Sequence, residues 1–250
     1  SKKHLKLKNP LSVEQAYLRS SLLPNHMSVL QANRMYAKDM AFYEISRIFI
    51  MRESGAELPD EPEMLGITMQ FEDNALARGK GLVEALAQSL GIEFDVKSAE
   101  SANYARGRLA NIMVDGVPVG TIGQVNPALN RRFKISSDVV HIELSVEQLL
   151  AEARPRQFKP VHRFPIIERD ITVTVPTATS WRSVVEALEA YAIVYLGEYQ
   201  GGNVPKGSKN LSFRVIVSEP TRTPTEEEAT RAEDRVKSLL ARKFPEKVKE

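Results

Sequence analysis

Basic side chains beyond position 155 of this 250-residue chain could contact the phosphates of a nucleic acid. Five of them flank or lie within segments that alternate apolar and polar residues: Arg163, Arg169, Lys206, Lys209 and Arg214. Guanidinium and ammonium groups form strong, charge-assisted hydrogen bonds with phosphate oxygens. The same residue types also occur on ordinary solvated surfaces. Whether these side chains form a nucleic-acid contact or a solvated surface therefore depends on the secondary-structure elements that carry them.

Other reactive side chains do not form a recognisable catalytic set. The chain contains no cysteine, which removes a thiolate nucleophile and a cysteine-based zinc site, and its four histidines are scattered. Gly79-Lys80-Gly81 stands before a helical pattern, as glycines that hold an anion do. The complete phosphate-loop pattern is absent, so we interpret this tripeptide as a helix start. We expect no catalytic residue and no metal ligand in this chain.

Composition and charge are typical of a globular protein without a strong overall field. Apolar residues make up 42% and charged residues 26%, and the formal net charge is +2. Residues 156–250 hold 16 Lys and Arg against 13 Asp and Glu, a balance of +3 that permits a basic patch. The chain shows no membrane-length apolar run and no signal segment, so we expect a cytoplasmic protein without membrane or DNA partners. It starts on Ser1, which suggests part of a longer protein.

Two prolines mark a predicted domain boundary. Pro155 and Pro160 each remove a backbone donor and restrict the preceding residue, so a helix cannot continue through them. We predict one domain over residues 1–155 and a second over residues 156–250. In the first, Asp115-Gly116 joins two strand patterns as a hairpin. This half is expected to be α+β, with a mixed or antiparallel sheet.

The second predicted domain has the element order βαββα. Its elements are expected at residues 169–175, 180–188, 193–199, 210–218 and 226–244. Ser180 is a predicted N-cap, and Thr225 with Glu228 is a predicted capping box. A short final strand could follow Pro245. This order is that of a ferredoxin-like split βαβ fold.

Alternation within these strands predicts which side chains lie on the open face of the sheet. Ile171 and the valines two and four positions later are expected to face the helices, which places Asp170 on the open face. Arg214 shares that open face, whereas Arg169 has the parity of the buried residues and could anchor the strand. An open polar face of this kind binds RNA in some proteins and is merely solvated in others.

Ordered motifs along nearly the whole chain resemble one family. Residues 9–24 resemble N-P-L-S-x-E…L-R-x-S-L-L-P, residues 42–49 resemble F-E-I-G-R-V-F, and residues 159–171 resemble K-P-x-x-R-F-P-x-x-x-R-D-I. These are motifs of the β subunit of bacterial phenylalanyl-tRNA synthetase, in its C-terminal part. One departure is Leu196-Gly197, which replaces the aromatic start of the motif F-D-V-Y-x-G.

For the first domain, the resemblance implies a class II synthetase-like core that is not catalytic and that associates with a separate α subunit. Catalytic class II domains carry arginines in R-x-E and G-x-G-x-x-x-R motifs, and Arg52-Glu53 lacks the required spacer. The resemblance implies a holoenzyme of two α and two β chains that uses ATP and magnesium. This chain itself is expected to bind no cofactor.

For the second domain, the resemblance implies a ferredoxin-fold module that binds the anticodon of tRNA(Phe) during Phe-tRNA synthesis. Aromatic rings near the open face could stack on unpaired bases. The predicted RNA contacts are Arg163, Phe164, Arg169, Asp170, Tyr199, Lys206, Lys209 and Arg214. The alternative is a stand-alone scaffold or truncated paralogue without a tRNA role.

Overall fold

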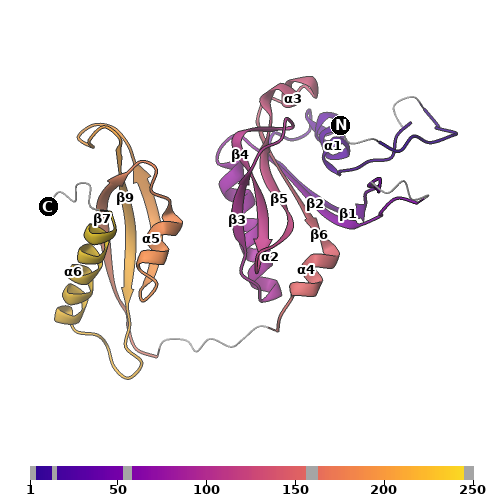
Figure 1. Cartoon of the computed structure of the whole chain (residues 1–250). Helices are drawn as coiled ribbons and strands as arrows, with labels where there is room; N and C mark the ends of the chain where they lie inside the picture. The colour runs from indigo at the N-terminus through magenta and orange to yellow at the C-terminus, as the bar shows by residue number, and fades with distance from the viewer. Residues whose placement is uncertain (1–3, 13–15, 53–57, 156–162, 245–250) are drawn as a thin grey trace. The chain divides into compact units, whose positions relative to one another are not determined.

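The computed structural model describes residues 4–12, 16–52, 58–155 and 163–244 (Figure 1). The chain forms two compact units, unit 1 (Ser1–Phe158) and unit 2 (Lys159–Glu250), and each has its own hydrophobic core. Within the described residues, no helix is both long and apolar enough to cross a membrane.

A six-stranded sheet forms the centre of unit 1, in the order β1-β2-β6-β5-β4-β3. Its strands are β1 (Met40–Arg47), β2 (Glu63–Phe71), β3 (Asp95–Ala99), β4 (Tyr104–Val114), β5 (Val117–Val125) and β6 (Asp138–Ser145). Every neighbouring pair is antiparallel, so the antiparallel alternative is the one that the chain adopts. The predicted hairpin is confirmed, because Val114 pairs with Val117 and the turn residues Asp115 and Gly116 have φ values of 48° and 83°.

Helices cover both faces of this sheet. They are α1 (Leu23–Asn33), α2 (Ala75–Leu90), α3 (Pro127–Arg132) and α4 (Val146–Glu152). On one face, Val83 of α2 joins the buried core with Ile67 of β2 and Ile142 of β6. On the other face, Met27 of α1 packs with Val139 of β6. Both faces at the centre of the sheet are therefore removed from water, as a layered core requires.

Unit 2 is a three-stranded antiparallel sheet covered by two helices. Its elements in chain order are β7 (Ile167–Pro176), α5 (Trp181–Ala187), β8 (Ala192–Tyr199), β9 (Ser208–Val217) and α6 (Glu226–Lys243) (Figure 1). The strand order is β7-β9-β8. Ile171 and Phe213 of the sheet share one core with Val184 of α5 and Val236 of α6, so both helices cover the same face. The predicted α+β class and βαββα order are confirmed.

Local signals in unit 2 also act as predicted. The Ser180 side chain accepts a hydrogen bond from the N–H of Ser183 at 3.2 Å, and Thr225 with Glu228 forms a complete capping box. Two short elements of unit 1, β3 and α3, carry too little periodicity to be predicted from sequence. The possible final strand after Pro245 lies outside the described residues.

Candidate nucleic-acid interface

Three cross-strand polar pairs line the uncovered face of the unit 2 sheet. Along β7 and β9, the pairs are Asp170–Arg214, Thr172–Ser212 and Thr174–Asn210. The hydroxyl oxygens of Thr172 and Ser212 lie 2.8 Å apart, and the Thr174 hydroxyl donates to Oδ1 of Asn210 at 2.9 Å. These positions alternate with the buried core positions, which confirms the open-face placement predicted for Asp170 and Arg214.

Arg214 is held by two carboxylates at one end of this face. Its guanidinium donates to both oxygens of Asp170, at 2.7 and 3.0 Å, and to Glu168 at 2.7 Å. The hydrogen bond from Arg214 holds the pKa of Asp170 below its ordinary value, and the same bond raises the pKa of Arg214. Because two anions surround one cation, this end of the face offers no excess positive charge to a phosphate.

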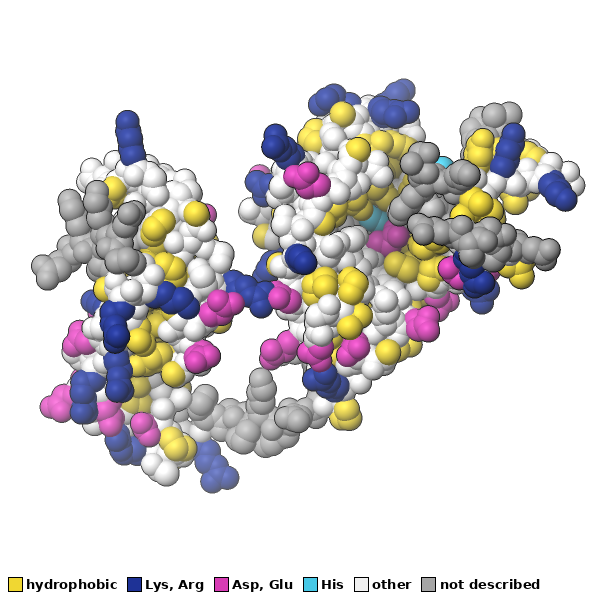
Figure 2. All heavy atoms as spheres, viewed as in Figure 1, with side chains coloured by type: hydrophobic (Ala, Val, Ile, Leu, Met, Phe, Trp, Pro, Cys, Tyr) yellow, Lys and Arg dark blue, Asp and Glu magenta, His cyan; other side chains and the backbone are white. Residues whose placement is uncertain are grey.

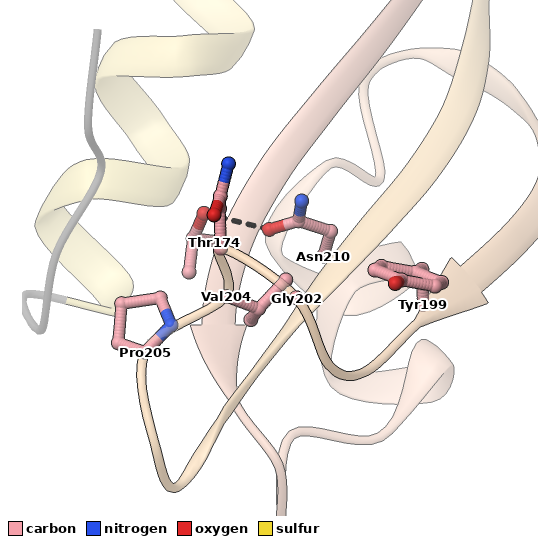
Figure 3. Close-up of a pocket in the computed structure, with 7 residues that line it drawn as sticks. Thr174, Tyr199, Gly202, Val204, Pro205 and Asn210 are labelled. Carbon is pink, nitrogen blue, oxygen red and sulfur yellow. Dashed lines mark hydrogen bonds between the residues drawn. The ribbon is translucent and has the colours of Figure 1, made fainter.

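A cavity of about 420 Å³ opens at the other end of the face. Figure 3 shows the residues that line it: Thr174, Tyr199, Gly202, Asn203, Val204, Pro205 and Asn210. Tyr199 is 60% exposed and lies opposite Asn210 in the sheet. An exposed ring beside amide and hydroxyl groups suits a planar heterocycle, which stacks on the ring and hydrogen-bonds at its edge.

Glycines shape the loop between β8 and β9 that closes this cavity. Gly201, Gly202 and Gly207 have φ values of 118°, 56° and 81°, a region that other residues rarely adopt. A Cβ added at Gly202 would lie 3.3 Å from the hydroxyl oxygen of Tyr199. The loop therefore passes close to the ring, and its course depends on glycine.

Besides Asp170 on the open face, four of the predicted RNA contacts lie at exposed positions. Arg163 and Phe164 lie a few residues before β7, and Phe164 is 37% exposed. Lys206 is exposed in the loop between β8 and β9, next to the cavity residue Pro205, and Tyr199 borders the cavity itself. The structure thus leaves these four side chains accessible to a ligand, although it brings only Tyr199 into the cavity wall.

Arg169 and Lys209 lie instead on the helix-covered side of the sheet. Arg169 forms an ion pair with Glu226 at the start of α6, and Glu233 of the same helix is 4.0 Å away. Lys209 is 7% exposed and donates to Glu198 at 2.6 Å. Parity places both residues there, so their geometry gives no support to the predicted phosphate contacts and indicates structural anchors.

The cavity contains residues that sequence reasoning did not select. Asn203 and Asn210 supply amides, and Thr174 supplies a hydroxyl. The signals were present, because Thr174 and Asn210 have open-face parity and Asn203 follows two glycines. Tyr195, by contrast, packs against Trp181 with ring centroids 5.4 Å apart, and so belongs to the helix side.

Charge on the visible surface is mixed. Figure 2 shows Lys and Arg side chains interspersed with Asp and Glu side chains on each unit, without a continuous basic patch in this view. This view therefore gives no sign of a broad positive field.

Several charged groups among the described residues of unit 1 are paired with one another. Arg52 forms an ion pair with Asp60 at 2.6 Å, and Arg19 forms one with Glu44 at 2.9 Å. Glu143 accepts hydrogen bonds from Ser21 and from the N–H of Leu22, both at 2.8 Å. Among the described residues, no group of three or more His, Asp and Glu is placed to hold a metal ion. Cations and carboxylates here neutralise one another.

Comparison with known families gives the class of this protein. Residues 1–146 match the family model of the phenylalanyl-tRNA synthetase beta chain CLM domain, and residues 162–249 match that of the ferredoxin-fold anticodon-binding domain. The two units are thus modules of an aminoacyl-tRNA synthetase. More particularly, the chain belongs to the phenylalanyl-tRNA synthetase β chain family.

Curated relatives agree with this assignment. The chain is 32% identical over 241 residues to the phenylalanine-tRNA ligase beta subunit of Dehalococcoides mccartyi, with 90% of this chain and 30% of the relative covered. It is 32% identical over 258 residues to that of Symbiobacterium thermophilum, with 94% and 29% covered. The chain therefore spans about 30% of the length of these relatives. Among solved structures, the pyrrolysyl-tRNA synthetase of Desulfitobacterium hafniense is similar at a TM-score of 0.48 and 20% identity, over 59% of this chain and 52% of that one. That similarity is too low to support a functional conclusion.

Proposed function

We propose that this chain acts within a phenylalanine-tRNA ligase and that its residues 156–250 bind the anticodon region of tRNA(Phe). The observation that carries this proposal is the cavity at Tyr199 on the open face of unit 2. Anticodon bases are unpaired in free tRNA, so they can leave the stack and enter such a cavity. Stacking of a base on Tyr199, with the amides of Asn203 and Asn210 at its edge, accounts for the chemistry of the lining.

The hydrogen bond within the cavity supports base recognition. Since the hydroxyl of Thr174 occupies Oδ1 of Asn210, the amide nitrogen of Asn210 is its donor end. A donor fixed in this way can hydrogen-bond an acceptor at the edge of a base that stacks on Tyr199. Phosphate contacts from Arg163 and Lys206 would position the strand without reading its sequence.

Unit 1 is proposed to be a non-catalytic module, over residues 1–155, that associates with a synthetase α subunit. ATP and magnesium would be used by the holoenzyme, for which an assembly of two α and two β chains in the cytoplasm is proposed. Two ion pairs support this division, because the carboxylates of Glu44 and Asp60 already neutralise Arg19 and Arg52. We therefore expect no ATP–pyrophosphate exchange by this chain alone.

The binding test compares two exposed tyrosines. Tyr199→Ala removes the proposed stacking surface, and Tyr36→Ala removes an 87%-exposed ring from unit 1 as the matched control. Base–aromatic stacking is worth about 1–3 kcal/mol, so Tyr199→Ala should weaken tRNA(Phe) binding by about 5- to 150-fold, and Tyr36→Ala should leave it unchanged. Equal affinities for the two variants would refute the assignment of the cavity.

The second test concerns the enzyme as a whole. Copurification with an α subunit followed by a Phe-tRNA charging assay should show activity that Tyr199→Ala reduces through tRNA binding. Association with the α subunit but no tRNA preference would instead support the scaffold alternative. ATP–pyrophosphate exchange by this chain without an α subunit would contradict the non-catalytic proposal.

A further inference from the structure

A chain of hydrogen-bonding side chains crosses the interface between α1 and the sheet of unit 1. In spatial order it consists of Glu44 (β1), His26 (α1), Thr68 (β2), His141 (β6) and Glu143 (β6). We call these five residues the buried relay. His26 is 1% exposed, and Thr68 and His141 are 0% exposed. None of them belongs to the nucleic-acid interface.

The side chains of the relay are held at short distances from one another. The Thr68 hydroxyl oxygen lies 2.8 Å from Nδ1 of His26 and 2.8 Å from Nδ1 of His141. Nε2 of His141 lies 3.2 Å from Glu143, and Nε2 of His26 lies 3.3 Å from Glu44. A Cβ added at Gly66 would lie 2.9 Å from Cε1 of His26, so glycine is what allows this ring to lie on β2.

Counting hydrogens shows that two neutral rings cannot satisfy the relay. The Thr68 hydroxyl has one hydrogen, so it donates to one ring and must accept from Nδ1 of the other. A neutral ring that donates through Nδ1 has a lone pair at Nε2, and that lone pair then faces a carboxylate. With both rings neutral, the Nε2 lone pair of one ring therefore faces Glu44 or Glu143 in place of an N–H donor.

One added proton satisfies every partner. If His26 carries it, His26 donates to Thr68 and Glu44, while Thr68 donates to His141 and His141 donates to Glu143. If His141 carries the proton, the Thr68 hydroxyl reverses and the same bonds are all made. A second proton would leave the Thr68 hydrogen without an acceptor in the relay and would place two cations at a centroid distance of 5.3 Å.

One contact of the relay is incomplete in the structure. Nε2 of His26 is buried and has no hydrogen-bond partner among the described residues, although Glu44 is within ion-pair distance. Burial, followed by the charge of His141, lowers the pKa of His26, and Glu44 opposes that shift. Burial disfavours ionised Glu143, but hydrogen bonds from His141, Ser21 and Leu22 outweigh it and leave its pKa below the ordinary value.

Other titratable groups around the relay are accounted for. Arg19, from the segment before α1, is already bound to Glu44 at 2.9 Å. Tyr104 of β4 is near Glu143, and burial followed by that charge raises the pKa of its phenol, so it stays neutral. These groups leave the two histidine rings as the carriers of the added proton.

We propose that His26, Thr68 and His141 form a single-proton site that makes the attachment of α1 to the sheet sensitive to acid. The folded chain accepts one proton shared by the two rings, and a second proton enters only when α1 leaves the sheet. The unfolded chain binds two protons at these histidines below their ordinary pKa of 6.5. Because the folded state binds one fewer, the fall in the folding equilibrium constant should approach tenfold per pH unit well below that value, before carboxylates titrate.

Nitrogen-15 NMR of the histidine rings in the whole chain tests this proposal directly, because the shift of each ring nitrogen reports its protonation. We expect one step in which both rings change together, for a total of one proton, while the backbone signals of unit 1 stay native. Thr68→Val removes the hydroxyl and lets each neutral ring donate to its own carboxylate, so the affinity for this proton should fall about tenfold. Thr68→Ser keeps the hydroxyl and should restore the shared step.

Three results would overturn the proposal. The first is two protons bound in separate steps by native chain. The second is no proton uptake by either ring before unit 1 unfolds. The third is a titration of Thr68→Val that matches the wild type. If Thr68→Val does not fold, Thr68→Ser and the wild type still decide the count of protons.

Discussion

The open face of unit 2 offers few unpaired cations, so its contribution to the salt dependence of tRNA binding should be small. Among the described residues, Arg163 and Lys206 are exposed without an ion pair. Arg169, Lys209 and Arg214 are bound to carboxylates. Each phosphate neutralised on a single strand adds about −0.7 to the slope of log K against log salt. Two contacts therefore contribute about −1.4, whereas all five would contribute about −3.5.

Paired variants of the whole chain measure these contributions by difference. Arg163→Gln with Lys206→Gln should make the slope for tRNA(Phe) less steep by about 1.4, and Arg169→Gln with Lys209→Met should leave it unchanged. Fluorescence anisotropy over a series of salt concentrations gives the slopes, and thermal melting verifies that each variant is folded. A change of about 1.4 in the second variant would show that the ion pairs with Glu226 and Glu198 open to bind phosphate, and would refute the reasoning.

Two further predictions concern stability. Gly66→Ala should destabilise unit 1 by about 1–3 kcal/mol in urea unfolding, because the added Cβ would lie 2.7 Å from Leu22 and 2.9 Å from His26; an unchanged midpoint would contradict this packing. The pKa of Glu228 is about 2, below the ordinary 4.5, because Arg222 and then the N–H of Thr225 donate to its carboxylate. Since the folded pKa is the lower one, this contribution to stability is complete above pH 4.5 and is lost as pH falls towards 2. Acid titrations should show that loss in the wild type and a flatter curve for Glu228→Gln.

Sequence patterns predicted the strands and faces of unit 2 better than they predicted which side chains contact one another. The alternation around Ile171 gave the buried and open faces, because a strand with one buried face must repeat every two residues. The same parity indicated that Arg169 anchors the strand, and the structure supplies Glu226 as its partner. That partner lies 57 positions away in the sequence, so only the packing of α6 on β7 could identify it.

The cavity and the buried relay were harder to predict for a related reason. The cavity depends on the course of a glycine-rich loop, and glycine permits the positive φ angles of that course without specifying them in advance. The relay joins His26 to His141 through Thr68, and these three residues come from separate elements. Scattered histidines therefore gave no motif, although the fold brings two of the four together.

The distribution of charge on unit 2 has a consequence for how it would recognise RNA. Phosphate contacts give affinity to any nucleic acid, whereas base contacts distinguish one sequence from another. On the open face, Glu168 and Asp170 surround Arg214, while Tyr199 and its neighbouring amides remain accessible. The two carboxylates at the opposite end of this face would repel a polyanion that offers no base to the Tyr199 ring. Unit 2 should therefore bind weakly but selectively, and tight binding of tRNA should require contacts made elsewhere in the proposed assembly.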